Sequence, residues 1–202
     1  MDALSYIITR YSTASSTRHN APIVLPIDRD ELAVLFNELD YKIGAEIGVA
    51  EGEYSEVLCK AIPGLNLYCI DAWQAYGGYN DYKNKERFER FYATAQARLI
   101  PYGCTIIREF SVDAVKHFIN QYFDFVYIDA AHDFLSITQD IAWWSAKVRK
   151  GGIVAGHDYK RDTNPTWRYH VKDVVPTWAY AHRISPWFIT TEHTPSWFWV
   201  KA

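Results

Sequence analysis

The sequence is short of the features that mark nucleic-acid-binding, membrane-spanning and secreted proteins. Its net charge is −3, and lysine and arginine are spread along the chain without a basic block, which argues against a nucleic-acid-binding face. No apolar run approaches the length of a membrane-spanning helix, and the N-terminus lacks a signal-peptide pattern. We therefore expect a cytoplasmic protein that binds neither nucleic acid nor membranes.

Cysteine is also scarce, and its three copies are Cys59, Cys69 and Cys104. Their spacing matches no metal motif, and an odd number so widely separated is typical of reduced, buried thiols in an intracellular protein. Aromatic residues are abundant instead. With 8 tryptophans and 15 tyrosines, several must be partly exposed, in a substrate cleft or at a subunit contact such as a homodimer interface.

Residues 43–52 predict a strand followed by a glycine turn. An apolar run ends near Gly48, and Gly52 precedes a segment with apolar residues at helical spacing. The face of that helix is formed by Tyr54, Val57, Leu58 and Ala61. Strand, turn and helix together are the opening unit of a doubly wound α/β fold.

The charge of this turn indicates the kind of ligand it would bind. A dinucleotide-binding turn places a pyrophosphate at the helix N-terminus. Here the turn carries Glu46, Glu51 and Glu53, which would repel a pyrophosphate. Three carboxylates suit a ligand with an ammonium and a sulfonium group, such as S-adenosylmethionine (SAM). A tight turn that binds no ligand is the alternative.

The rest of the chain alternates apolar strands with amphipathic helices. The further parallel strands are expected at 67–70, 105–108, 125–128 and 153–155. Helices are expected at 29–39, 83–99, 112–120, 134–148 and 173–182, with Asp28 and Ser111 as caps and Pro176 in the first turn of the last. Two aromatic strands, 187–190 and 197–200, would close the chain as an antiparallel hairpin. We predict one Rossmann-like α/β domain with five parallel strands plus this hairpin, and no internal repeat.

Two segments fit no regular element. Residues 1–27 are interpreted as an N-terminal extension, whose polar stretch 12–20 would form either a lid or a tail. The glycine- and aromatic-rich segment 72–82 would form a loop over the cofactor or a substrate wall, or else a packed surface loop.

Polar residues follow four of the predicted strands. They are Glu46, Asp71, Asp129 and the pair His157 and Asp158. In an open α/β sheet these strand ends meet at one crevice. His132 follows Asp129 by three residues and could act as a general base, or merely cap a helix. Asp129, His157 and Asp158 could bind a divalent cation, or shape the site by hydrogen bonding alone.

Four motifs together resemble the SAM-dependent class I methyltransferases. They are E-I-G-V-A-E-G at 46–52, C-I-D-A-W at 69–73, V-Y-I-D-A-A-H at 126–132 and G-G-I-V-A-G-H-D-Y at 151–159. The last two match a bacterial group with Y-I-D-x-x-H and G-G-x-x-x-G-H-D-Y signatures, which includes sugar O-methyltransferases. The resemblance covers about residues 40 to 200. It implies one methyltransferase domain over 1–202 with a seven-stranded sheet, SAM as cofactor, and a small-molecule or sugar acceptor.

The resemblance also implies a role for each matching residue. Gly48 and Gly52 would let the methionine end of SAM approach the backbone, with Glu46 near its ammonium group. Asp71 would bind the ribose hydroxyls. The other expected members of the cofactor site are Ala72 and Trp73 beside the ribose or adenine, Ser111 and Val112 at the adenine, and Asp129.

The end of the fourth parallel strand is similar to that of catechol O-methyltransferases. This similarity implies that Asp129 and His132 are catalytic, and that Asp129, His157 and Asp158 hold Mg²⁺ or Mn²⁺. Two other functions remain open. One is an NAD-type oxidoreductase, which the acidic turn disfavours, and the other is a module that binds SAM or a partner without turnover.

Overall fold

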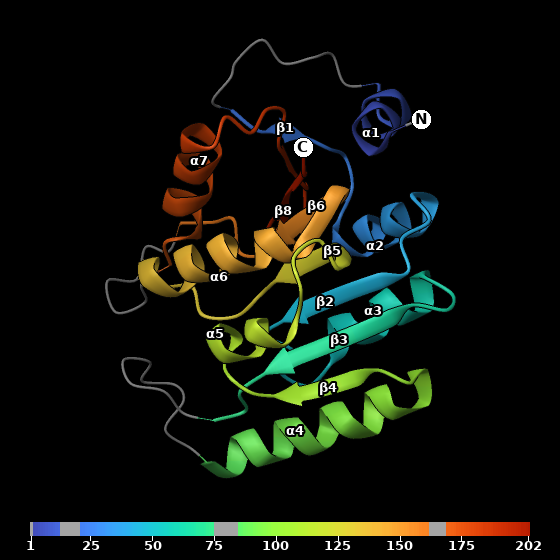
Figure 1. The fold of residues 1–202 in the computed structure, drawn as a ribbon, viewed down its shortest axis with the longest axis vertical. Coiled ribbons are helices and arrows are strands. Elements are labelled where there is room, and N and C mark those ends of the chain that lie inside the picture. The colour runs from blue at the N-terminus through green and yellow to red at the C-terminus, as the bar shows by residue number, and fades with distance from the viewer. Residues whose placement is uncertain (1, 13–20, 75–84, 162–168) are drawn as a thin grey trace.

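One eight-stranded sheet runs through the molecule in the order β1-β7-β8-β6-β5-β2-β3-β4 (Figure 1). The computed structural model describes residues 2–12, 21–74, 85–161 and 169–202. The strands are β1 (Ile23–Val24), β2 (Ile43–Ile47), β3 (Asn66–Asp71), β4 (Thr105–Arg108), β5 (Phe123–Ile128), β6 (Val148–Gly156), β7 (Phe188–Ile189) and β8 (Trp197–Val200). Strands β2 to β6 are parallel, whereas β8 is antiparallel to both β6 and β7.

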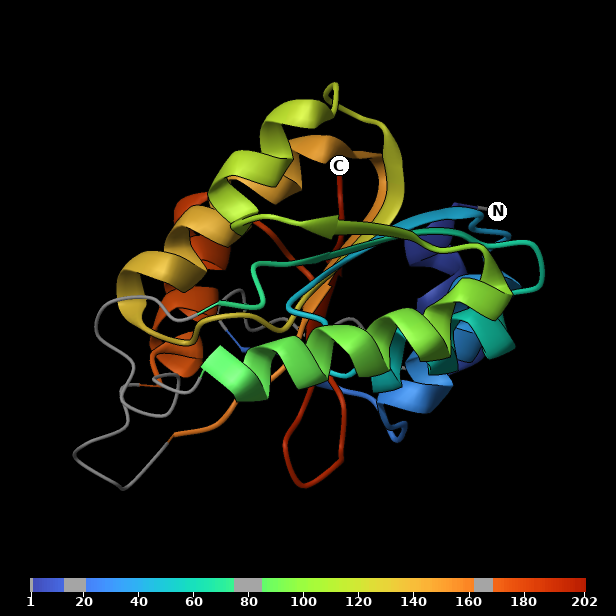
Figure 2. The same cartoon turned by 90° about the horizontal axis from the view of Figure 1, so that it is seen from below.

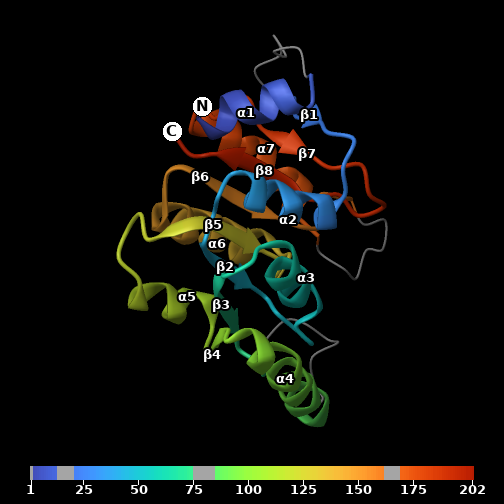
Figure 3. The ribbon, with the colours of Figure 1, turned by 90° about the vertical axis from the view of Figure 1, so that its right-hand side faces the viewer.

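Helices cover both faces of this sheet (Figures 2 and 3). One face carries α1 (Ala3–Arg10), α2 (Arg29–Glu38), α3 (Glu53–Ala61) and α4 (Lys85–Leu99). The other carries α5 (Ser111–Ala114), α6 (Phe134–Lys147) and α7 (Val171–Ala181). Short 3-10 turns follow α4 at Ile100–Tyr102 and α5 at Val115–His117. The doubly wound class predicted from the sequence is confirmed.

The two cores follow from the alternation of side chains along each strand. In β5, Phe125 and Tyr127 pack with α2 and α3, whereas Val126 and Ile128 pack on the opposite face with α6. Each of these four side chains is at most 2% exposed. Because the parallel strands are buried on both faces, their sequences are almost continuously apolar.

Several local predictions are confirmed and others are wrong. Asp28 does cap α2, accepting hydrogen bonds from the amides of Asp30 and Glu31 at 3.0 and 2.9 Å. The C-terminal strands are antiparallel as expected, but β8 lies between β6 and β7. Strand β1, which pairs parallel with β7, was not predicted because two residues carry no recognisable alternation.

Two helices differ from their predicted bounds. Helix α5 ends at Ala114, and Ser111 does not cap it because its hydroxyl bonds to Asp140 on α6. Helix α7 begins at Val171, so Pro176 lies inside it and not in its first turn. Proline has no amide hydrogen, so the carbonyl of Lys172, one helical turn earlier, lacks its usual hydrogen bond within the helix. Lys172 is exposed, so water can bond to this carbonyl.

Parts of two predictions lie outside the described residues. Most of the polar stretch 12–20 and of the loop 72–82 belongs to these parts. Of the expected N-terminal extension, Ala3–Arg10 is a helix whose Ile7 is fully buried. Within the described ranges, no helix combines the length and hydropathy that a bilayer crossing requires.

The three cysteines lie close together in the fold although they are far apart in the sequence. All are free, and the sulfur atoms of Cys59 and Cys104 lie 3.4 Å apart. Cys69 is fully buried, while Cys59 and Cys104 are half-buried. The expected burial is therefore confirmed for Cys69 only.

Gly44 in β2 leaves room for the ring of Phe125, which stacks on Phe36 with centroids 4.4 Å apart. A Cβ at Gly44 would lie 2.2 Å from that ring, and the backbone there is not in a left-handed conformation. Gly44→Ala should therefore lower the free energy of unfolding by roughly 1–3 kcal/mol or more, through overpacking alone. Urea unfolding measures this. Phe125→Leu in the same chain should recover part of the loss; two strictly additive effects would contradict the explanation.

Candidate functional site

The carboxyl ends of the central strands surround a cavity of about 220 Å³. Every expected cofactor-binding residue except Glu46 and Gly52 lines it: Gly48, Asp71, Ala72, Trp73, Ser111, Val112 and Asp129. These residues follow β2, β3, β4 and β5, so the sheet order explains how they meet.

Asp71 fastens the glycine turn to the end of β3. Its carboxylate accepts hydrogen bonds from the amides of Val49 at 3.0 Å, Ala50 at 2.9 Å and Trp73 at 2.8 Å. Burial raises the pKa of Asp71, although these amides oppose the shift. A carboxylate offers about four acceptor positions, so a further donor from a ligand can still bind.

Trp73 forms a fixed wall of the cavity. Its indole Nε1 donates to the carbonyl of Ala50 at 2.7 Å, and the side chain is only 1% exposed. The ring packs at a tilt against Tyr92 of α4, with centroids 4.9 Å apart. Trp73 itself has a φ of 42°, a left-handed conformation uncommon for tryptophan, which these contacts hold in place.

The two glycines of the turn have different roles. Gly48 has a φ of 90°, and a Cβ there would lie 2.2 Å from the carbonyl oxygen of Asp129. Its absence of a side chain lets the β2 turn pass against the exit of β5. Gly52 has a φ of 76° at the N-terminus of α3, where a Cβ would approach Leu99 at 3.0 Å. Gly52 therefore serves the packing of α3 on α4 and does not reach the cavity.

Glu46 is not where the sequence led us to expect it. Its side chain is 1% exposed and accepts a short hydrogen bond from the hydroxyl of Ser55 on α3. Strand alternation explains this, because Ile47, which does line the cavity, points to the other face of β2. Burial raises the pKa of Glu46 to about 8, so the group is largely protonated at neutral pH.

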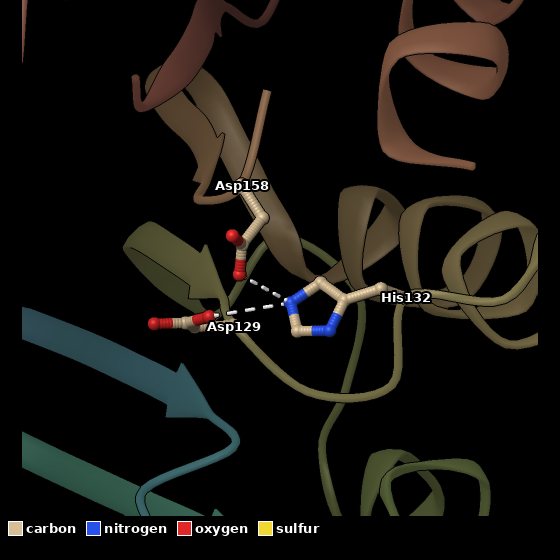
Figure 4. A group of neighbouring side chains, drawn as sticks. All are labelled: Asp129, His132 and Asp158. Atoms are coloured by element: carbon tan, nitrogen blue, oxygen red, sulfur yellow. Dashed lines mark ion pairs between the residues drawn. The ribbon is translucent and has the colours of Figure 1, made fainter. Parts of the chain in front are cut away.

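Asp129, His132 and Asp158 point toward one another beside the cavity (Figure 4). Nε2 of His132 lies 2.7 Å from Oδ2 of Asp158 and 3.6 Å from Oδ1 of Asp129. Despite these distances, Nε2 forms no well-directed hydrogen bond with any described residue, so its N–H axis misses both carboxylates. Three ligand-type atoms thus lie within 4.8 Å of one another, joined by ion pairs and not by a well-directed hydrogen bond of Nε2.

His157 lies at the edge of this cluster. Its Nδ1 is 3.6 Å from Asp129 and 3.7 Å from Asp158. The structure therefore groups His132, and not His157, most tightly with the two carboxylates. The expected set of Asp129, His157 and Asp158 is brought together, with His132 as a nearer imidazole.

The charges of the cluster compensate one another. Burial alone would lower the pKa of His132, but Asp129 and Asp158 outweigh it and raise that pKa to about 9. Burial would also raise the pKa of Asp158, but His132, His157 and Lys160 hold it well below its usual range. Lys160 already lies 3.0 Å from Asp158, and an imidazolium or a metal cation between the two carboxylates would balance the negative charge that remains.

Several cavity residues were not predicted from the sequence. They are Phe88 and Phe91 of α4, Phe110, and Ser136, Gln139 and Asp140 of α6. Asp140 did leave a signal, because it interrupts the apolar face that Ile137, Ile141 and Trp144 form at helical spacing. A carboxyl group on the buried face of a helix is rare enough to mark a candidate site.

The fold and the acidic strand ends define a class I methyltransferase-like protein. A model of the methyltransferase domain family matches residues 45–159, and the chain belongs to this family. The matched range includes the glycine turn, Asp71 and the whole Asp129, His132 and Asp158 cluster. A comparison with curated protein sequences gave no match.

Solved structures share the fold at low sequence identity. An O-methyltransferase from Bacillus cereus, solved in complex with SAH, is 13% identical with a TM-score of 0.59, covering 98% of this chain and 90% of its own. A candidate caffeoyl-CoA O-methyltransferase from Staphylococcus aureus is 15% identical with a TM-score of 0.62, covering 98% of both chains. A candidate rRNA methylase from Clostridium thermocellum is 8% identical with a TM-score of 0.61, covering 89% of this chain and 99% of its own. The fold is therefore shared by proteins described with different acceptors.

Glu46 should make stability depend on pH. Its pKa is about 8 in the folded protein and near 4.5 when unfolded, so the folded state binds its proton more tightly. Stability should therefore fall as pH rises from about 4.5 to 8, by at most roughly 5 kcal/mol, and then level off. The Glu46→Gln variant lacks this titration. Urea unfolding of both proteins from pH 5 to 9 should show a widening difference in favour of the variant; parallel curves would contradict it.

Proposed function

We propose that the protein is a SAM-dependent methyltransferase that methylates a hydroxyl group of a small molecule or sugar with the help of a divalent cation. The observation that supports this most strongly is the adjacency of two features. A cavity bounded by Gly48, Asp71 and Trp73 adjoins a cluster of cation-binding groups, and Asp129 belongs to both. The SAH-bound O-methyltransferase with the same fold adds support for the cofactor.

The cavity suits the chemistry of SAM. Asp71 can accept a bond from a ribose hydroxyl, and the glycine turn offers bare backbone next to it. Much of the remaining lining is aromatic or aliphatic, which fits a flat purine ring, and polar residues such as Gln139 and Asp140 complete it. Glu46 is too deeply buried to meet the ammonium group directly, so we assign that contact to the turn itself and to Asp129, which lines the cavity.

The reaction needs positioning more than it needs acid–base groups. SAM supplies an activated methyl group when bound, and holding an acceptor oxygen in line with it can contribute roughly 7–11 kcal/mol. The protein must also favour loss of the hydroxyl proton. A cation held by Asp129 and Asp158, with His132 or His157, would lower the pKa of a hydroxyl bound to it.

His132 can have one of two roles but not both at once. Its Nε2 would either ligate the cation or accept the hydroxyl proton as a general base. Both roles need an unprotonated Nε2, whereas the neighbouring carboxylates favour the protonated form in the absence of a cation. A cation held by the two carboxylates would displace that proton. We assign His132 to the cation because its ring nitrogen and the carboxylate oxygens of Asp129 and Asp158 converge within 4.8 Å, and the metal requirement of turnover tests this assignment.

Asp71 provides the test of cofactor binding. Asp71→Asn keeps the size of the side chain but replaces one acceptor oxygen by a donor, so it should weaken S-adenosylhomocysteine binding by roughly tenfold or more. Asp71→Ala should abolish measurable binding, partly because the turn at Val49 and Ala50 loses its anchor. Calorimetry measures both. Wild-type affinity in the Asn variant would remove Asp71 from the cofactor site.

The cation provides the second test. A chelator should stop methyl transfer, and Mg²⁺ or Mn²⁺ should restore it. Asp158→Asn should weaken Mn²⁺ binding by at least roughly tenfold, because it removes an anionic ligand. Calorimetry or electron paramagnetic resonance measures this binding. The matched control is Asp173→Asn on α7. This residue forms an exposed pair with His170, the residue before the helix, at 3.3 Å, and its substitution should leave Mn²⁺ binding unchanged. Full turnover in chelator would return His132 to the role of a base acting alone.

A further inference from the structure

Asp140 is a buried carboxyl group that the proposed chemistry does not use. It lies on α6 and is 3% exposed, yet it borders the cavity. Its Oδ1 accepts a hydrogen bond of 2.5 Å from the hydroxyl of Ser111, which begins α5 after β4. No described residue is found bonded to Oδ2, which leaves that oxygen available to a group inside the cavity.

A purely structural role accounts poorly for a carboxyl group at this position. Its neighbours on the helix face are Ile137, Ile141 and Trp144, so an apolar side chain would pack there without a desolvation cost. Burial raises the pKa of Asp140 to about 7 even though Ser111 donates to it. One hydrogen bond thus offsets only part of the cost, and a second donor would stabilise the ionised form further.

The position of Asp140 indicates which part of a ligand it would meet. The reacting end of the site is the cluster that follows β5 and β6, whereas Ser111 follows β4. In the sheet, β4 lies three strand intervals from β5, about 14 Å at ordinary strand spacing. Asp71, at the tip of β3, lies between them. A cofactor whose ribose bonds to Asp71 would therefore extend its base toward Ser111 and Asp140.

The lining of the cavity includes apolar residues on which a flat ring can pack. Among them are Ile70, Phe88, Phe91, Phe110 and Val112. Apolar side chains present no hydrogen-bond donors or acceptors, so they bind one purine as well as another. Discrimination among purines then falls to the polar residues of the lining, which include Ser111, Gln139 and Asp140.

We propose that Asp140, held by Ser111, accepts a hydrogen bond from the exocyclic amino group of the cofactor's adenine and so selects a 6-amino purine over a 6-oxo purine. This inference rests on the proposed function, because it requires an adenosyl cofactor in the cavity. Above its raised pKa of about 7 the Asp140 carboxyl is ionised, and an ionised carboxylate only accepts hydrogen bonds. A 6-amino group satisfies it, whereas a 6-oxo group would place an acceptor against an acceptor and leave a buried charge unpaired.

The test compares S-adenosylhomocysteine with its 6-oxo analogue, S-inosylhomocysteine, by calorimetry at a pH of about 8.5, where a carboxyl group with a pKa of about 7 is ionised. The wild-type protein should bind the adenosyl compound more tightly by roughly ten- to hundredfold, the range expected for one hydrogen bond to a charged group. Asp140→Asn keeps the shape and can donate to a 6-oxo group. The variant should bind the adenosyl compound more weakly and the inosyl compound more tightly, so that the ratio of their two dissociation constants comes near one.

The matched control is Asp113→Asn, the same chemical change on an exposed residue of α5 that pairs with Lys116. Its selectivity should equal that of the wild type. Equal binding of the two compounds by the wild type would overturn the role of Asp140 and leave the proposed function standing. If Asp140→Asn lost affinity for both compounds by the same factor, that would also overturn the role of Asp140 in selectivity, because it would show a structural role only. Binding of neither compound by the wild type would overturn the proposed function and this inference together.

If Asp140→Asn does not fold, as judged by its thermal unfolding without ligand, the wild-type ratio alone still decides. Ser111→Ala then serves as the second variant, because it frees Asp140 from its anchor without changing the charge. It should reduce the selectivity by a smaller factor than Asp140→Asn is expected to do. Unchanged selectivity in Ser111→Ala would contradict the positioning role given to Ser111.

Discussion

The hydrogen bonds that Asp71 accepts from Val49, Ala50 and Trp73 are the interaction on which the site depends. They join the glycine turn after β2 to the end of β3 and fix Trp73 in a left-handed backbone conformation. Gly48 completes the arrangement by letting the same turn lie against Asp129. Without these contacts, the strand ends would still converge, but the cavity would have no defined wall.

A second constraint is the need to balance charge in a partly enclosed space. Asp129 and Asp158 approach the same imidazole nitrogen, and that nitrogen is poorly directed toward either. Two carboxylates and an imidazole whose ligand-type atoms converge within 4.8 Å are arranged as ligands are around a cation. The surroundings of Asp140 have a different character, because this single carboxyl group lies on a helix face among Ile137, Ile141 and Trp144 and bonds to the hydroxyl of Ser111.

Much of this site could be predicted because parallel strands end at one edge of the sheet, whatever their order. Asp71, Asp129 and Asp158 were identified as strand-end residues, and the structure places them around one crevice. The fate of Glu46 could not be predicted, because the sequence does not show which face of a strand meets α3 and Ser55. Asp140 was not predicted because it lies on a helix and not at a strand end, although the sequence does show a carboxyl group on the same helix face as Ile137 and Ile141. Helix α5 was overextended because Ser111 suggested a cap, whereas its hydroxyl bonds across to another helix.

The most direct test is a crystal structure of the protein with S-adenosylhomocysteine and Mn²⁺, with data collected to show manganese by anomalous scattering. The account predicts a ribose hydroxyl within hydrogen-bond distance of Asp71 and one anomalous peak bounded by Asp129, His132 and Asp158. A nucleoside bound outside the cavity, or manganese bound away from these residues while the cluster holds none, would contradict it.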